Sequence, residues 1–542
     1  MNGPRNLVLA VMFVILASGF SAAATAANIY IAQNAAGGNT GADCADAFAV
    51  SWFNSSANWG SGAAQIGPGV TVHLCGTFNA PAGASGYLTF QGGGNSSSPV
   101  TLLFESGAVL TAPYWGGNGA ILGTSNYTLV DGGTNGLITA TANGTGLANQ
   151  VSNTTAVVMY NASNSEVRNL TITNLYVHSA NLSDTADGTQ GARGAIYFYN
   201  ASNGLVHGNT IHDTGTCIRL GYSTNSNFQA YGNTCYNINW GIIVGDNGGG
   251  DSLTGLVAVY NNDIHDFAPW DQTDNFNHHD GIYFFATNTG SSFSGGLIYN
   301  NFIHGDPGEY TNTFIFTSDD PSHTCGGHYI FNNVLVNTSG TTNDTPANGL
   351  VQDWCVGDFV YNNTMLGIMQ SSTNPENNSN PGMNVNPGTN ITIENDILEL
   401  FRNGWGIGGS GSISASDYND YYNNGDLAWD RTNTAYHTLS SLQGCHSNGC
   451  PAGTHDTNSA AGDPLLTGTY HLTGASSAAW QTGKNLYSVC NGQPNPGLGA
   501  LCYDKAGVQR PSTANWDMGA YEDSSASGAA PSPPTGLNAQ VQ

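Results

Sequence analysis

A repeated phrase, asparagine followed by any residue and then an apolar one, is the feature that most constrains the fold of this chain. It recurs at Asn209-Thr-Ile211, Asn233-Thr-Cys235, Asn262-Asp-Ile264, Asn301-Phe-Ile303, Asn333-Val-Leu335, Asn363-Thr-Met365 and Asn395-Asp-Ile397. The steps between these asparagines are 24, 29, 39, 32, 30 and 32 residues. An imperfect period of this size is typical of a solenoid, in which each repeat stacks only on its neighbours. The uneven steps exclude ankyrin-like and leucine-rich arrays and predict an all-β parallel β-helix, with the asparagines as a scaffold ladder.

An alternating strand precedes each asparagine of this ladder. The strands align as Ile196-Tyr-Phe-Tyr199, Ile218-Arg-Leu-Gly221, Ile242-Ile-Val-Gly245, Ile282-Tyr-Phe-Phe285, Phe314-Ile-Phe-Thr317, Leu350-Val-Gln-Asp353 and Met383-Asn-Val-Asn386. Alternation sends the first and third residues inward and the second and fourth outward. The outward set is rich in aromatic rings, which cover the C–H faces of sugars. We therefore predict a substrate-binding face made of Tyr197, Tyr199, Arg219, Trp240, Asp246, Trp270, Tyr283, Phe285 and Asp353.

Residues 1–26 have the pattern of a secretory signal peptide. Arg5 supplies the positive n-region, an apolar h-region covers 7–20, and small residues at 24–26 allow cleavage before Ala27. Export predicts a secreted, extracellular or cell-surface protein whose ten cysteines form disulfides. Neighbours in sequence suggest the pairs Cys44–Cys75, Cys325–Cys355, Cys445–Cys450 and Cys490–Cys502. Cys217 and Cys235 either pair as well or leave Cys235 as a core thiol, and no Cys-x-x-Cys occurs that would favour a zinc cluster.

The start of the chain provides a cover for the first coil. Apolar spacing over residues 44–53 predicts one amphipathic helix, and the phrase GPGVTVHLCGTF at 67–78 predicts a turn followed by a strand. The capping helix, this phrase and the asparagine ladder together resemble secreted right-handed parallel β-helix proteins of the pectate-lyase-like superfamily. The resemblance implies a right-handed parallel β-helix. It does not imply one activity, because that superfamily holds lyases, hydrolases, epimerases, adhesins and phage spikes.

The end of the chain is loop-rich. Residues 504–522, with Arg510-Pro511 and Asp517-Met-Gly-Ala-Tyr-Glu522, resemble the closing signature of many bacterial surface β-helix proteins. The last residues look like the first strand of a fibronectin type III module. We predict a signal peptide (1–26), an N-terminal cap with the first coils (27–98), a parallel β-helix (99–424), a disulfide-bonded C-terminal cover (425–523) and a linker with the start of a module (524–542).

The longest loop of the ladder region, residues 266–281, carries most of the candidate chemistry. It leads into the strand that bears Tyr283 and Phe285. Glycoside hydrolysis needs two carboxylates about 5–5.5 Å apart for retention or about 6.5–9.5 Å apart for inversion. We predict that Asp280 pairs with Asp319 or Asp320 of the next coil. The predicted catalytic residues are Asp280, Asp319, Asp320, His279 and His278.

Two alternatives stay open for this site. An Asp-Gly entering a strand looks somewhat like polygalacturonase-type hydrolases, but their Gly-His-Gly and Arg-x-Lys motifs are missing here. A lyase needs a base, which Arg219, Tyr283 or His279 could provide, and often calcium, which Asp271 and Asp274 could hold. The poverty of cations favours a hydrolase, which requires no cofactor. The His-Asp phrases at His212 and His265, with His304 in the matching position, are expected to be turn residues.

The amino-acid composition limits the classes of binding partner. Nine Lys and Arg against 36 Asp and Glu give a net charge of −27, which repels nucleic acid and anionic membrane surfaces and disfavours polyanionic sugars. No segment beyond the signal is long and apolar enough to span a membrane. We predict a secreted, monomeric enzyme that cleaves an extracellular polysaccharide, with hydrolase ahead of lyase. The rival prediction is a non-catalytic adhesive β-helix that binds glycans.

Overall fold

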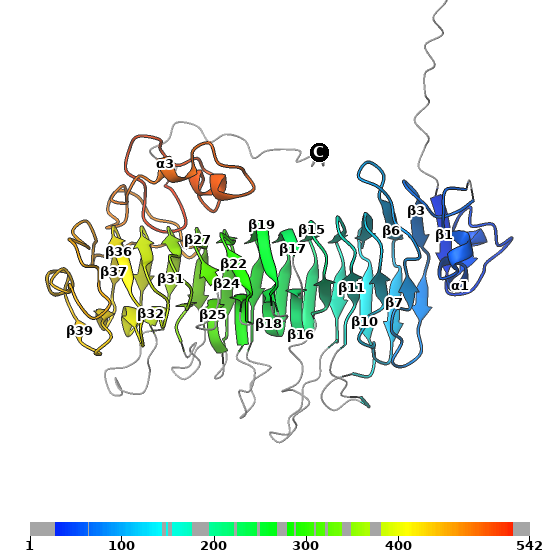
Figure 1. Cartoon of the computed structure of the whole chain (residues 1–542), viewed down its shortest axis with the longest axis horizontal. Helices are drawn as coiled ribbons and strands as arrows, with labels where there is room; N and C mark the ends of the chain where they lie inside the picture. Colours follow the sequence, from blue (N-terminus) through cyan, green and yellow to red (C-terminus); the bar gives the residue numbers. More distant parts are fainter. Residues whose placement is uncertain are drawn as a thin grey trace, which may run out of the picture.

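Parallel strands from successive coils form three long faces that run the length of the molecule (Figure 1). The structure, a computed structural model, describes residues 28–62, 64–143, 148–149, 154–175, 194–221, 225–246, 250–267, 279–286, 289–307, 311–319, 324–338, 348–368 and 381–523. Of residues 225, 246, 279, 311, 312, 319 and 324 it describes the backbone alone. Each coil adds one strand to each face. The parallel β-helix predicted from the asparagine phrase is confirmed.

The first face lies just before the asparagine phrase in each coil. Its strands are β1 (Asn28–Ala32), β2 (Phe48–Ala49), β3 (Thr71–Leu74), β6 (Val100–Phe104), β9 (Thr128–Asp131), β12 (Glu166–Arg168), β15 (Gly204–His207), β17 (Asn225–Tyr231), β19 (Ser252–Tyr260), β22 (Ser292–Ser294), β23 (Leu297–Tyr299), β26 (Thr324–Gly326), β27 (Tyr329–Phe331), β30 (Phe359–Tyr361), β33 (Ile391–Glu394) and β36 (Ile413–Asp417).

The second face follows the asparagine phrase. It contains β4 (Thr77–Asn79), β7 (Val109–Ala112), β10 (Leu137–Ala140), β13 (Thr171–Thr173), the first part of β16 (Thr210–Gly221) and of β18 (Thr234–Asp246), β20 (Asp263–His265), β24 (Phe302–Gly305), β28 (Val334–Asn337), β31 (Thr364–Leu366), β34 (Ile397–Glu399) and β37 (Asp420–Tyr422).

The third face carries the strands on which the substrate-binding face was predicted. It contains β5 (Leu88–Thr89), β8 (Ile121–Gly123), β11 (Val157–Tyr160), β14 (Ile196–Tyr199), the second part of β16 and of β18, β21 (His279–Ala286), β25 (Thr311–Asp319), β29 (Val351–Asp353), β32 (Pro381–Val385), β35 (Asn403–Ile407) and β38 (Asp426–Trp429), with β39 (Ala435–Tyr436) antiparallel to β38.

The asparagines form the predicted ladder, buried between the first and second faces. From Asn209 to Asn333, each backbone N–H and each side-chain amide donates to the Oδ1 of the next asparagine, at 2.9–3.2 Å for the steps to Asn233 and Asn262. Asn363 donates in the same way to Asp396 Oδ1. The same amides also donate to a strand carbonyl, as Asn363 does to that of Ile330. Each asparagine rung from Asn209 to Asn363 therefore satisfies its buried polar atoms within the stack.

The last rung is not the predicted one. Met365 pairs with Leu398 rather than with Ile397, so Asp396 takes the ladder position and accepts from Asn363. Asn395 occupies the preceding left-handed position, with φ of 66°. The ladder then ends at Asn419, which accepts from the backbone N–H of Asp396 at 3.0 Å.

Five disulfides tie neighbouring coils and loops: Cys44–Cys75, Cys217–Cys235, Cys325–Cys355, Cys445–Cys450 and Cys490–Cys502. The four predicted pairs are confirmed, and the open alternative for Cys235 is settled because it bonds to Cys217 on the neighbouring coil.

The predicted N-terminal helix over residues 44–53 is wrong in extent. The segment contains a 3-10 turn (Cys44–Asp46), strand β2 and a single-turn helix α1 (Val50–Phe53), followed by a second 3-10 turn (Ser56–Asn58). The helix is interrupted because Phe48 and Ala49 pair with β1 instead. Phe53 nevertheless closes the end of the core, with its ring 5.1 Å from that of Trp59.

The C-terminal region covers more than the open end of the helix. Helix α2 (Leu439–Leu442) packs at the end, but the chain then turns back, and α3 (Tyr487–Cys490) and the 3-10 helix η5 (Leu498–Cys502) lie along the side of the coils near β27 and β36 (Figure 1).

One buried arginine fastens this returning segment to the coils. Arg510 donates to Glu522 Oε2 at 2.9 Å and to Asn332 Oδ1 at 3.1 Å, and it lies over the ring of Trp516. The sequence that resembles a closing signature is thus a strap along the helix. Among the described residues, no helix is long and apolar enough to cross a membrane.

Candidate functional site

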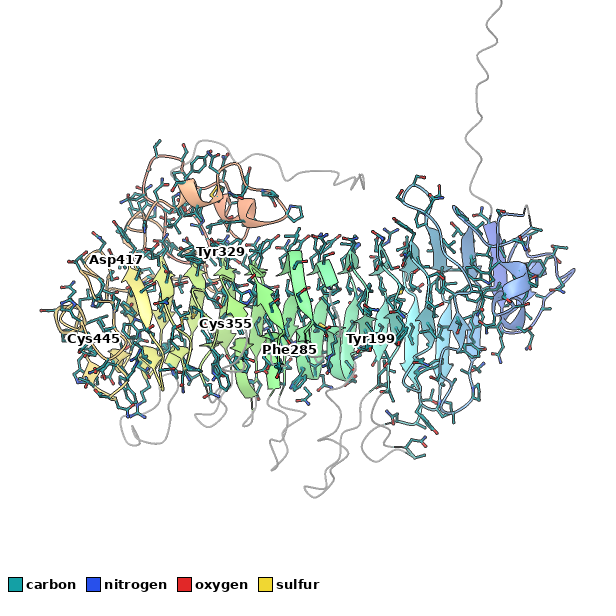
Figure 2. The ribbon with its side chains drawn as sticks, in the orientation of Figure 1. Tyr199, Phe285, Tyr329, Cys355, Asp417 and Cys445 are labelled. Carbon is teal, nitrogen blue, oxygen red and sulfur yellow. A yellow bond between two sulfur atoms is a disulfide. The ribbon has the colours of Figure 1, made fainter. Side chains whose placement is uncertain are left out.

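The outer side of the third face carries a row of aromatic side chains. One column of paired residues runs Tyr160, Tyr199, Gly221, Gly245, Phe285, Ser318 and Trp354, from β11 to the residue after β29. The neighbouring column runs Tyr197, Arg219, Ile243, Tyr283, Phe316 and Gln352. We call the rings of Tyr160, Tyr199, Tyr197, Tyr283, Phe285, Phe316 and Trp354 the aromatic row. Figure 2 labels Tyr199 and Phe285, which lie along one line across the coils.

The rings of the aromatic row contact one another in two groups. In the first, Tyr160 stacks on Tyr199 with ring centres 4.7 Å apart, and Tyr197 meets Tyr199 edge-on at 5.9 Å. Gly221 separates the groups. A β-carbon at Gly221 would lie at ordinary contact distance from the Tyr197 ring (3.5 Å) and from Arg219 Nε (3.4 Å), so the row is interrupted here because glycine carries no ring.

The second group is centred on Tyr283. Its ring stacks on Phe285 and on Phe316, each at 4.9 Å, and Phe316 meets Trp354 edge-on at 5.2 Å. Trp240 lies against Tyr283 at 6.4 Å. The predicted aromatic face is therefore present, with Phe316 as an additional member.

Exposure along the row is uneven. Tyr160 is 43% exposed and Trp354 is 37% exposed, whereas Tyr197, Phe285 and Phe316 are buried. The middle of the row is not the open apolar patch that its outward direction predicts. The accessible rings are the two ends, which are six strand spacings apart, or about 29 Å at about 4.8 Å per strand.

Charged groups accompany the row at its centre. Arg219 and Asp280 are both buried, and their charges act on the Tyr283 hydroxyl. Tyr283 also hydrogen-bonds to Ser318 Oγ at 2.8 Å. Burial, together with the Asp280 carboxylate, raises the pKa of Tyr283 above its ordinary value, so the phenol keeps its proton at neutral pH. Tyr283 can donate a hydrogen bond here, but it is poorly suited to remove a proton.

The predicted carboxylate pair is not brought together. Asp280 lies opposite Thr313 of β25, whereas Asp319 lies opposite Ala286, six residues farther along the sheet. At about 3.3 Å per residue this offset is about 20 Å, far beyond the separation that glycoside hydrolysis needs. The pairing of Asp280 with Asp319 is therefore wrong.

Asp353 was predicted to face outward, and this is also wrong. Ile315 pairs with Ile282, so β25 and β29 are offset by one residue from the predicted alignment, and Thr317 and Asp353 point inward. A slip of one residue exchanges the two faces of a strand. Asp353 is fully buried, and burial raises the pKa of its carboxyl; the same holds for its neighbour Asp358.

The remaining predicted residues divide by position. Tyr197, Tyr199, Arg219, Trp240, Tyr283, Phe285 and Asp280 lie together on the third face. Asp246 pairs with Ala286 at the end of β18, but its side chain, like those of His279 and Asp319, is outside the described part. Trp270, Asp271, Asp274, His278 and Asp320 lie outside the described residues, so the calcium site and the second carboxylate remain predictions.

Sequence reasoning missed three members of the row. Tyr160 lies in the coil before the first ladder asparagine, and that coil has Leu170 where the later coils have asparagine. The strand Val157-Val-Met-Tyr160 nevertheless repeats the alternating pattern of β14, with which it pairs. Phe316 was assigned inward by the one-residue offset. Trp354 follows the strand that was misaligned.

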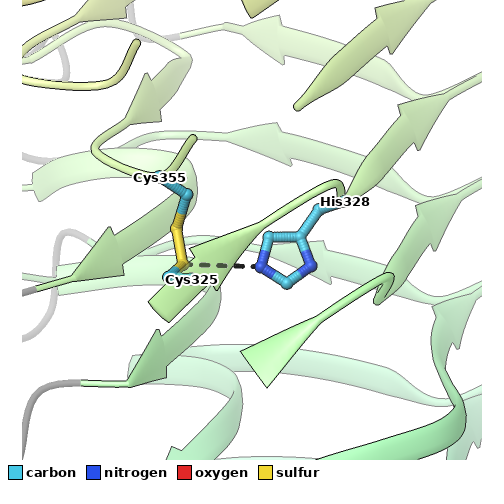
Figure 3. A group of neighbouring side chains, drawn as sticks. All are labelled: Cys325, His328 and Cys355. Atoms are coloured by element: carbon cyan, nitrogen blue, oxygen red, sulfur yellow. Dashed lines mark hydrogen bonds between the residues drawn. A yellow bond between two sulfur atoms is a disulfide. The ribbon is translucent and has the colours of Figure 1, made fainter. Parts of the chain in front are cut away.

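A buried cysteine and histidine group inside the helix has the residues of a metal site but another role. Cys325, His328 and Cys355 lie close together (Figure 3), with the two sulfurs joined as a disulfide and Cys325 Sγ 3.5 Å from His328 Nε2. Bonded sulfurs are not thiolate ligands. Complete burial lowers the pKa of His328 to about 3, so the ring is neutral. Its Nδ1 accepts a hydrogen bond from the Gly296 N–H.

Neither a protein-family model nor a curated protein sequence matches this chain. Among solved structures, the crystal structure of pectate lyase Pel9A is similar. The alignment covers 92% of this chain and 96% of that chain, with 15% sequence identity and a TM-score of 0.33. At this identity a likeness concerns the fold alone, and the low TM-score carries nothing about the site. From its own strand pairing, the chain is a disulfide-bonded parallel β-helix protein.

Proposed function

We propose that the protein is exported and binds an extracellular polysaccharide along the aromatic row of the third face. The carrying observation is the row itself, with Tyr160 and Trp354 exposed at its two ends. Aromatic rings present flat apolar surfaces that match the C–H faces of sugars, and their polar tips reach hydroxyls. The five disulfides fit the export that the N-terminal sequence predicts.

The charge of the protein selects among glycans. A net charge of −27 repels a polyanionic chain, and the cation beside the row in the described part of the chain, Arg219, is buried. A neutral polysaccharide, extended across several coils, is the ligand that fits best. The length between the accessible ends, about 29 Å at the usual strand spacing, supports an extended chain rather than a monosaccharide.

Cleavage of that polysaccharide is the second candidate function. It is favoured by Asp280 and Arg219, which lie beside Tyr283 of the row. The protonated Tyr283 suits hydrogen bonding to a hydroxyl or a glycosidic oxygen, and Asp280 is a carboxylate whose charge acts on Tyr283. A two-carboxylate hydrolase would need a partner for Asp280 other than Asp319.

The binding function is tested by affinity electrophoresis on neutral and uronic polysaccharides. We expect Trp354→Ala and Tyr160→Ala each to weaken binding roughly 2- to 10-fold, because an aromatic contact contributes about 0.5–1.5 kcal/mol. The control is Tyr503→Ala, because Tyr503 is a comparably exposed aromatic residue (36%) in the C-terminal segment, away from the row. Equal losses in all three variants, or no retardation by any polysaccharide, would contradict the proposal.

The second candidate has its own readout. Incubation with each bound polysaccharide, with and without a calcium chelator, is followed by assays for reducing ends and for unsaturated products that absorb in the ultraviolet. A hydrolase releases only the former, and a lyase releases both. Binding without any product, in the parent and in Asp280→Asn alike, removes cleavage and leaves a glycan-binding protein.

A further inference from the structure

The outer side of the second face carries a different column of rings, away from the aromatic row. It runs His212, Tyr236, His265 and His304 on successive coils. The ring centres are 4.5, 5.1 and 4.8 Å apart, and all three pairs are stacked. The prediction that these histidines are turn residues is wrong, because His212, His265 and His304 lie on strands β16, β20 and β24 and point outward from the sheet.

His265 and His304 are adjacent in this column and share a carboxylate neighbour. Asp263 lies two residues before His265 on β20, and its Oδ1 is 2.8 Å from His304 Nε2 on β24. One nitrogen of each histidine and one oxygen of Asp263 lie within 4.8 Å of one another. All three side chains are partly accessible, so an ion in solution can reach them.

A second carboxylate orients the His265 ring. His265 Nδ1 is 2.7 Å from Asp266 Oδ2, while Asp266 Oδ1 accepts from the backbone N–H of Asp306 at 3.2 Å. Gly305 makes this possible, because a β-carbon there would lie 2.5 Å from Asp266 Oδ1 and its φ is +90°. With Nδ1 engaged, Nε2 is the nitrogen that His265 presents to a ligand. A carboxylate behind a ligating imidazole is the usual outer partner of a protein metal site.

We propose that His265, His304 and Asp263 bind a divalent first-row transition metal ion of the zinc class, which clips β20 to β24. Two imidazoles and one carboxylate are a ligand set for zinc and its neighbours and not for calcium, which takes oxygen ligands. Lys505 supplies a positive charge that acts on Asp263, which disfavours cations held by charge alone. Coordinate bonds to imidazole therefore decide the selectivity.

The required movement is small. Ligand atoms around a tetrahedral ion at about 2.0–2.1 Å are about 3.3 Å apart. The distance of 2.8 Å between His304 and Asp263 is already close to this value. The other two separations are at most 4.8 Å, and they shorten when the stacked His265 and His304 rings tilt toward each other. Three protein ligands leave positions for water.

The chain supplies a matched control two coils earlier. His212 Nδ1 is 2.7 Å from Asp213 Oδ2, the same adjacent His–Asp pair as His265 with Asp266. The next ring in the column is Tyr236 rather than a second histidine. His212 therefore keeps the pair and the stacking but lacks the second imidazole.

The test is calorimetric titration of the whole chain, made without a polyhistidine tag, with Zn²⁺, and visible absorption after addition of Co²⁺. We expect one equivalent to bind and Co²⁺ to give the absorption of a low-symmetry site with nitrogen ligands. His304→Ala and His265→Ala should abolish both signals, and Asp266→Asn should weaken binding roughly 10- to 100-fold. His212→Ala should bind as the parent does. Circular dichroism and the thermal midpoint without metal verify that each variant is folded.

Three outcomes would overturn the proposal. These are no binding to the parent chain, binding that His304→Ala and His265→Ala leave unchanged, or binding that His212→Ala lowers as much as they do. Zn²⁺ should also raise the thermal midpoint of the parent and of His212→Ala but not of His304→Ala. This site and the aromatic row are on different faces, so the glycan-binding proposal stands or falls separately.

Discussion

Replacing Asp396 by asparagine should stabilise the protein, and the gain should grow with pH. Asp396 is a carboxyl in a ladder of amides, and its Oδ2 has no hydrogen-bond partner. The rungs on either side of it are Asn363 and Asn419. Their side-chain amides donate to the strand carbonyls of Ile330 and Ile393, respectively. An amide at position 396 would restore the donor that the ladder lacks.

The magnitude follows from the pKa of Asp396. The pKa of Asp396 rises from 3.8 to about 8, mainly because the carboxyl is buried. The hydrogen bonds from Asn363 oppose this rise, and the Glu394 charge adds to it. The folded state therefore holds a proton that the unfolded state releases, so stability is full below pH 3.8 and falls as pH rises toward 8. At 1.36 kcal/mol per unit, the loss is at most about 2 kcal/mol at pH 5 and about 4 kcal/mol at pH 7. Asparagine does not titrate and escapes this loss.

The assay is urea unfolding of the parent and of Asp396→Asn at pH 5 and at pH 8, followed by circular dichroism. The stability difference should be larger at pH 8 by a few kcal/mol. Asn363→Asp is the mirrored control, because it places a second carboxyl one rung earlier and should destabilise most at pH 8. A difference between the parent and Asp396→Asn that is the same at both pH values would refute the reasoning, since the carboxyl would then not be held protonated.

Two further changes test the supports of the coils. Arg510→Met should leave the buried Glu522 without its partner and destabilise the C-terminal segment by about 3–5 kcal/mol. Protease should then cleave within residues 463–523 while the coils resist. An unchanged cleavage pattern would contradict the role of this segment as a strap. Joint replacement of Cys325 and Cys355 by serine should lower the unfolding free energy by about 3–4 kcal/mol, because the bond closes a loop across 30 residues; a loss below about 1 kcal/mol would show that this chain-entropy argument does not apply.

The sequence was sufficient for the architecture because the ladder repeats one physical requirement. A buried amide must hydrogen-bond above and below, so each coil places the same residue at the same turn. From Asn209 to Asn363 this predicts the stack correctly. The prediction fails at Asn395-Asp396, because either of these adjacent polar residues could occupy the ladder position. Only the pairing of Met365 with Leu398 decides between them.

The candidate site was less predictable, because it depends on the register between coils that are joined by long connections. Phe314-Ile-Phe-Thr317 offers apolar residues in both alternations, so its facing could be read either way, and the error passed on to Asp353. The distance between Asp280 and Asp319 depends on the same register. The stacked tyrosines of β11 and β14 follow the same alternating pattern, but the coil of β11 has Leu170 in place of the ladder asparagine that marks the later coils.

The most direct test of the central claim is oxidative footprinting of the protein with and without a bound neutral polysaccharide, read by mass spectrometry. If the glycan lies along the aromatic row, Tyr160 and Trp354 should both be protected, while the equally accessible Tyr503 should react as before. Measurable binding that leaves Tyr160 and Trp354 unprotected, or that protects Tyr503 instead, would place the glycan elsewhere and contradict the account.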